Sequence, residues 1–97
     1  MRIAITDGEQ GVVLEDGLAR RWLGKAVRTK TWSLTHSGRL SIPEFVDGLE
    51  RLIIRTALND DDLDLFLDLL DLAENAVARS GYVRIAIEHD IKPKRKR

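Results

Sequence analysis

The chain has 97 residues, enough for one domain with a hydrophobic core, and we assign residues 1–91 to that domain. It contains no cysteine, which excludes disulfide scaffolds, cysteine nucleophiles and thiolate zinc sites and is typical of a cytoplasmic protein. Sixteen basic and sixteen acidic residues balance overall, yet residues 44–74 hold ten acidic and two basic residues, and residues 75–97 hold seven basic and two acidic ones. This segregation permits a polyanionic partner or head-to-tail self-association. The sequence predicts neither a signal peptide nor a membrane span, because acidic or basic residues interrupt every long apolar run.

The N-terminal segment predicts a β-hairpin. Arg2–Thr6 alternates apolar and polar side chains, as a half-buried strand does. The cluster Asp7–Gly11 is typical of a turn, and Val12–Leu14 supplies the second apolar run.

Residues 16–27 predict an amphipathic helix with Asp16 as its N-cap. Its inward face consists of Leu18, Ala19, Trp22, Leu23 and Ala26. Its opposite face consists of Arg20, Arg21, Lys25 and Arg28. A basic face of this kind either contacts phosphates or is merely solvated, and it could also be neutralised by Asp64, Asp68 and Asp71 of the same chain or of a partner chain.

The next segment, from Thr29 to Thr35, is rich in threonine and alternates around Trp32 and Leu34, which predicts a strand. The tripeptide at residues 36–38 would end it. Aromatic residues among Lys and Arg can stack on nucleic-acid bases. Trp22 and Trp32 both fall at inward positions, however, so core packing is the favoured role.

The pattern Ser41-x-x-Glu44 is a capping box with Pro43 in the first turn, and it predicts the start of a helix. The amphipathic pattern continues to about Leu58. The short break that follows predicts an antiparallel helical hairpin with the next segment.

The most apolar segment is residues 59–80, which predicts a central helix capped by Asn59 or Asp60. One narrow stripe is polar and consists of Asp60, Asp64, Asp68, Asp71, Asn75 and Arg79. Nearly all the remaining surface is apolar, so this helix must be covered on more than one side. The seam expected to form an oligomer interface, in a homodimer or a higher even oligomer, consists of Leu65, Leu69, Leu72 and Ala76.

The C-terminal segment predicts a strand at Tyr82–Glu88, after a helix end at Gly81. Its core repeats the N-terminal tetrapeptide Arg-Ile-Ala-Ile, which indicates that the two terminal strands lie in one sheet. The basic tail at residues 92–97 is expected to be disordered. These elements predict an α+β domain, with three helices on one face of a small mixed or antiparallel sheet of about four strands, in the order ββαβααβ along the chain.

The sequence predicts no enzyme, cofactor or metal site. His36 and His89 stand in no catalytic or metal-ligand pattern. The series Asp60, Asp62 and Asp64 resembles the start of a calcium loop, but Leu65 stands where that loop requires glycine.

Two non-enzymatic functions remain. The first is a nucleic-acid-associated module in which the basic helix and the tail contact phosphates. The phosphate-binding tail residues would be Lys92, Lys94, Arg95, Lys96 and Arg97. The alternative is a protein-interaction or assembly module that oligomerises through the central helix and has no nucleic-acid role.

Overall fold

A computed structural model describes residues 1–56 and 59–89, with only the main chain of Trp32. The elements are β1 (Arg2–Thr6), β2 (Gly11–Glu15), α1 (Asp16–Arg28), the 3-10 turn η1 (Trp32–Leu34), β3 (Gly38–Ser41), α2 (Ile42–Arg55), α3 (Asp60–Ala78) and β4 (Tyr82–Glu88). The four strands form one antiparallel sheet in the spatial order β2-β1-β4-β3. The structure therefore confirms the predicted α+β class and the predicted element order. The basic tail lies outside the described residues.

The two terminal strands are the central pair of the sheet. Antiparallel pairing sets Ile3 opposite Ile87 and Ile5 opposite Ile85, so the repeated tetrapeptides align side by side. Since side chains alternate across a strand, these isoleucines all point to one face and form a layer of the core. The inference drawn from the repeat is confirmed.

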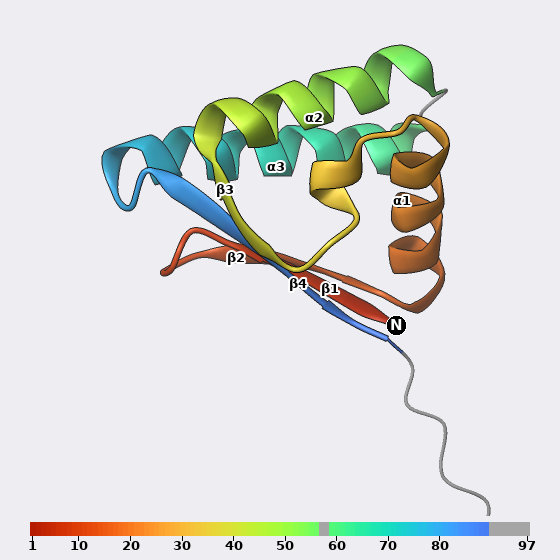
Figure 1. Cartoon of the computed structure of the whole chain (residues 1–97), viewed down its shortest axis with the longest axis horizontal. Coiled ribbons are helices and arrows are strands. Elements are labelled where there is room, and N and C mark those ends of the chain that lie inside the picture. Colours follow the sequence, from red (N-terminus) through yellow and green to blue (C-terminus); the bar gives the residue numbers. More distant parts are fainter. Residues whose placement is uncertain (57–58, 90–97) are drawn as a thin grey trace, which may run out of the picture.

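All three helices cover the same face of the sheet, as Figure 1 shows, and leave the opposite face open. The helices α2 and α3 lie next to each other and run in opposite directions, which confirms the predicted hairpin. Phe45, Leu49 and Leu69 are fully buried where the helices meet the sheet. One hydrophobic core therefore lies between the helical layer and the sheet.

The helix starts follow the sequence signals in two cases of three. The Ser41 hydroxyl accepts the Glu44 amide at 3.3 Å and so caps α2, while it donates to the Glu44 carboxylate at 3.0 Å in place of the Ser41 amide of an ideal capping box. Asn59 accepts the Asp62 amide at 2.8 Å and caps α3. The predicted N-cap of α1 is wrong. Asp16 is already inside the helix, with a φ of 49°, because its amide donates to the carbonyl of Met1 at 2.7 Å and ties the helix start to the sheet.

The third strand lies later than predicted. The segment from Thr29 to Thr35 is not a strand, because its threonines close the end of α1. Thr29 donates to the Lys25 carbonyl at 2.9 Å, and the Thr31 amide donates to the Ala26 carbonyl at 2.9 Å. The chain then forms η1 and pairs with β4 only from Gly38 onward.

The remaining ends of the helices also differ in detail from the prediction. The helix α2 ends at Arg55, where Thr56 turns extended, so it is shorter than the predicted helix to residue 58. Gly81 has a φ of 76° and donates its amide to the Ala76 carbonyl, as a glycine after a helix end does. No helix in the described ranges is long and apolar enough to cross a membrane.

Candidate nucleic-acid interface

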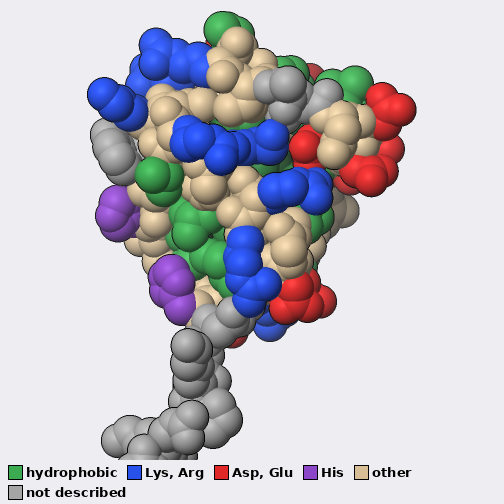
Figure 2. Space-filling model, turned by 90° about the vertical axis from the view of Figure 1, so that its right-hand side faces the viewer, with side chains coloured by type: hydrophobic (Ala, Val, Ile, Leu, Met, Phe, Trp, Pro, Cys, Tyr) green, Lys and Arg blue, Asp and Glu red, His purple; other side chains and the backbone are tan. Residues whose placement is uncertain are grey.

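The predicted phosphate-binding helix, α1, has three exposed basic residues, Arg20, Arg21 and Arg28, whereas the Lys25 side chain is only 14% exposed. Figure 2 looks onto this end of the molecule and shows Lys and Arg side chains across its middle, with Asp and Glu gathered mainly at its right side. Ala19, Trp22 and Ala26 are buried, so the inward face was predicted correctly.

Asp62 forms ion pairs with two of the four cations of α1. Arg21 donates to Asp62 Oδ1 at 2.7 Å, and Lys25 Nζ lies 3.8 Å from Asp62 Oδ2. The Asp62 side chain is only 10% exposed, so this contact joins α1 to the first turn of α3 in a setting that water screens poorly. Arg21 and Lys25 therefore help to hold α1 and α3 together.

The three acidic residues that could neutralise α1 do not do so within the chain. Asp64, Asp68 and Asp71 are exposed on α3 and make no ion pair within the described residues. Part of α1 is neutralised instead by Asp62, a residue that the sequence singled out only through its resemblance to part of a calcium loop. The remaining predicted cations of α1, Arg20 and Arg28, are exposed.

The other predicted phosphate contacts cannot be placed, since Lys92, Lys94, Arg95, Lys96 and Arg97 lie outside the described residues.

The tryptophans offer no described stacking surface. Trp22 is 5% exposed, which agrees with the predicted core role, and the Trp32 side chain is outside the description. The indole N–H of Trp22 has no hydrogen-bond partner in the described part of the chain. It borders a cavity of about 10 Å³ near Lys25 and Asp62, which has room for about one water molecule.

The sequence missed a second group of cations, on the open face of the sheet. Arg39 of β3 is the direct cross-strand neighbour of Arg84 of β4. Neither makes an ion pair with a carboxylate among the described residues, and Arg39 Cζ lies 4.3 Å from the centre of the Tyr82 ring. Like charges directly opposite each other are unfavourable in a sheet, so an anion placed between them would stabilise both. Alternation along β4 could have revealed Arg84, but the misplaced third strand concealed Arg39.

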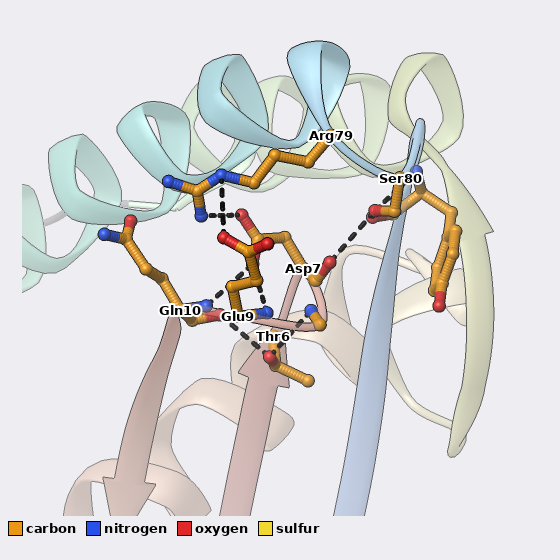
Figure 3. Close-up of polar contacts among 8 residues, drawn as sticks. Thr6, Asp7, Glu9, Gln10, Arg79 and Ser80 are labelled. Atoms are coloured by element: carbon orange, nitrogen blue, oxygen red, sulfur yellow. Dashed lines mark hydrogen bonds and ion pairs between the residues drawn. The ribbon is translucent and has the colours of Figure 1, made fainter.

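Another carboxylate, Asp7, forms hydrogen bonds and an ion pair that join parts of the fold (Figure 3). The turn amides of Gln10 and Glu9 donate to its Oδ1 at 2.8 and 2.9 Å, and Arg79 donates to its Oδ2 at 2.9 Å. These two amides and the guanidinium hold the pKa of Asp7 below its ordinary value of 3.8, although burial opposes them. Ser80 also donates to the Asp7 carbonyl, so the β1–β2 turn is fastened to the link between α3 and β4.

The predicted oligomer seam lies inside the subunit. The structure places Leu65, Leu69, Leu72 and Ala76 in the core of one chain, at 9% exposure or less. They are covered by the sheet and the other helices, so the expected interface location needs correction. The opposite flank of α3 is the exposed one, with Leu63 at 42%, Leu67 at 54% and Val77 at 64%.

Among the described residues, no three His, Asp or Glu side chains lie together in a group that could hold a metal ion. Both histidines are exposed, and His36 Nδ1 shares a hydrogen bond with the Thr35 hydroxyl. Comparisons with protein-family models, curated proteins and solved structures found no match to this chain.

Proposed function

We propose that this protein is a small non-enzymatic module that associates with nucleic acid through phosphate contacts. The observation that carries the proposal is the pair Arg39 and Arg84, which lie opposite each other on the uncovered face of the sheet. Without a carboxylate among the described residues to offset them, they form a local excess of positive charge. A phosphate backbone supplies the compensating charge.

The basic helix and the tail extend this proposal. Arg28 is the α1 residue proposed for phosphate contact, because it is exposed while Asp62 engages Arg21 and Lys25. The tail from Lys92 to Arg97 is proposed as a second electrostatic contact. A cytoplasmic location stays a prediction from the absence of cysteine.

Binding of a random single strand and a random duplex, at low and at moderate salt, tests the function. We expect binding that weakens steeply with salt. Deleting residues 92–97 should flatten the log–log slope by about 0.9 for each duplex phosphate that the tail had neutralised, and it should leave the unfolding free energy unchanged. Full-length protein that binds neither nucleic acid at low salt would refute the proposal.

A second candidate, assembly, has its own observation. Leu63, Leu67, Leu70 and Val77 follow a spacing of four, three and seven residues along α3, which is the spacing of a helix–helix seam. Three of the four are exposed and Leu70 is half-buried. A homodimer that packs this flank against a partner would bury them.

Light scattering separates the two flanks of α3. If the exposed flank mediates assembly, Leu67→Glu should yield a folded monomer, whereas Leu69→Glu should unfold the chain because Leu69 is fully buried. A wild-type protein that is monomeric at tens of micromolar, an ordinary range for interface affinities, would refute assembly.

A further inference from the structure

The open face of the sheet is divided by charge. At one end, Arg2 lies 3.9 Å from both Glu15 and Glu88, so two carboxylates surround one guanidinium. At the other end, Arg39 and Arg84 are neighbours without such a carboxylate in the described ranges. A polyanion approaching this face is therefore repelled at the first end and attracted at the second.

Between the two ends, the two central strands carry short side chains. Ala4 of β1 pairs with Ala86 of β4 on one side and with Val13 of β2, which is 46% exposed, on the other. A hollow of about 470 Å³ lies beside the two arginines and is lined by Ser37, Gly38, Arg39, Arg84, Ile85 and Ala86. The cationic end thus has space for a nucleotide unit, and the two central strands place only alanine side chains in the neighbouring row.

Tyr82 holds Arg39 in place. The guanidinium carbon lies 4.3 Å from the ring centre, which is a cation–π contact, and Tyr82 is itself half-buried. An arginine restrained in this way loses less side-chain entropy when a ligand binds. Since Arg39 is exposed, its guanidinium is also accessible to a ligand from solvent.

From this arrangement we propose that the open face binds single-stranded nucleic acid, with a base stacked on Arg39 and a phosphate held by Arg84. The proposal rests on the proposed function and adds its substrate class. Unpaired bases stack on aromatic rings and guanidinium planes, whereas bases in a duplex are already stacked on each other. This open face of the sheet also lacks the protruding helix or ribbon that enters a duplex groove.

The first measurement compares a labelled random single strand with a duplex of the same length, using the full-length protein at low salt. The single strand should bind more tightly. Replacing Arg39 and Arg84 together by Gln should weaken single-strand binding at least about fivefold, the loss expected for one stacked base. The log–log salt slope should fall by about 0.7 for each phosphate that the variant no longer neutralises.

Two further variants separate stacking from charge. Tyr82→Leu changes no charge, so it should weaken single-strand binding about two- to fivefold, the range of one exposed cation–π contact, without changing the salt slope. Tyr82→Phe keeps the ring and should bind as the wild type does. The matched charge control is Arg51→Gln with Arg55→Gln on α2, which removes two exposed arginines elsewhere and should have the smaller effect.

Each remaining outcome refutes the proposal in a distinguishable way. A duplex bound as tightly as the single strand, or Arg39 and Arg84 variants that bind like the wild type, would remove the substrate class and leave nucleic-acid association intact. Polyglutamate that competes as well as unlabelled single strand would instead indicate an acidic polypeptide as the ligand. Absence of binding to either nucleic acid would remove the proposed function together with this inference.

Discussion

Two pairs of cations in this protein have opposite fates. Arg21 and Lys25 on α1 share the carboxylate of Asp62, which is nearly buried between α1 and α3. Arg39 and Arg84 are direct cross-strand neighbours in the sheet, but neither forms an ion pair with a carboxylate of the described residues. The first pair joins two helices, and the second is left for an external anion.

This difference shows that the density of charge along a sequence does not measure the charge available to a ligand. The helix α1 has the more obvious basic pattern, with four cations on one face. Tertiary packing brings one acid of α3 against it and uses two of them. The sheet pair is separated by 45 positions in the sequence and becomes a pair only through strand register.

The largest expected effect comes from breaking the α1 pair. Asp62→Asn removes the carboxylate that Arg21 and Lys25 contact and should lower the unfolding free energy by about 1–3 kcal/mol. The cost stays below that of a fully buried pair because Arg21 is 49% exposed. Single-strand binding should increase, since α1 gains an available cation.

Urea unfolding and the single-strand titration measure the two effects of Asp62→Asn. The control is Asp64→Asn, which makes the same change of charge at an exposed position of α3 and should alter stability by no more than about 0.5 kcal/mol. Equal stability losses in both variants would mean that the Asp62 contacts contribute nothing specific.

The next prediction concerns a substitution close to the sheet pair that lowers stability without changing any charge. Ser41 belongs to β3, two residues after Arg39, and caps α2. Ser41→Ala should cost about 1 kcal/mol, because a helix-start amide loses its acceptor, while single-strand binding at the sheet stays unchanged. A double replacement of Ser41 and Glu44 by Ala should cost no more than the larger single one, since both belong to one box.

Local signals were sufficient to predict most of the fold. The alternation of β1 and β4, the capping box and the apolar length of α3 all act over a few residues, and each gave the correct element. The strand predicted around Thr31 was wrong because β propensity does not reveal that a threonine hydroxyl can close a helix instead.

The candidate site was harder to predict because it depends on contacts between distant residues. Which acid neutralises α1 is decided by the packing of α3, and Asp62 is the one that turns inward. The pair of Arg39 and Arg84 required the position and register of β3, which the sequence signals misplaced. The apolar seam at Leu69 was identified as a surface needing cover, and the subunit itself supplies that cover.

A smaller effect is expected when the charge of one arginine of the sheet pair is reversed. Arg84→Glu places a carboxylate opposite Arg39 and should raise the unfolding free energy by about 0.2–1 kcal/mol, the usual value of one cross-strand charge pair. Arg84→Glu should weaken single-strand binding more than Arg84→Gln does, because the introduced carboxylate also repels phosphate.

The same replacement at Arg21 provides the contrast. Arg21→Glu sets a second carboxylate beside Asp62, so it should destabilise the protein and leave binding at the sheet unchanged. Chemical denaturation of both variants checks the opposite signs. If Arg84→Glu destabilised the fold as Arg21→Glu does, the sheet arginines would have a structural partner after all.

The last effect is a dependence of stability on pH that appears only in acid, and it concerns Asp7, a carboxylate that is more completely buried than Asp62. Because its pKa is lowered in the folded state, Asp7 contributes stability that is fully present above the ordinary value of 3.8 and is lost as the pH falls through the lower folded value. The stability difference between wild type and Asp7→Asn should therefore be constant from pH 7 to about pH 5 and shrink toward about pH 3. Asp47→Asn, which removes an exposed carboxylate paired with Arg51, is the matched control and should show no comparable narrowing. A difference for Asp7→Asn that stayed constant into acid would mean that Arg79 and the turn amides stabilise the protonated and ionised carboxyl equally, and the enclosed pair would then differ from the α1 pair in geometry alone.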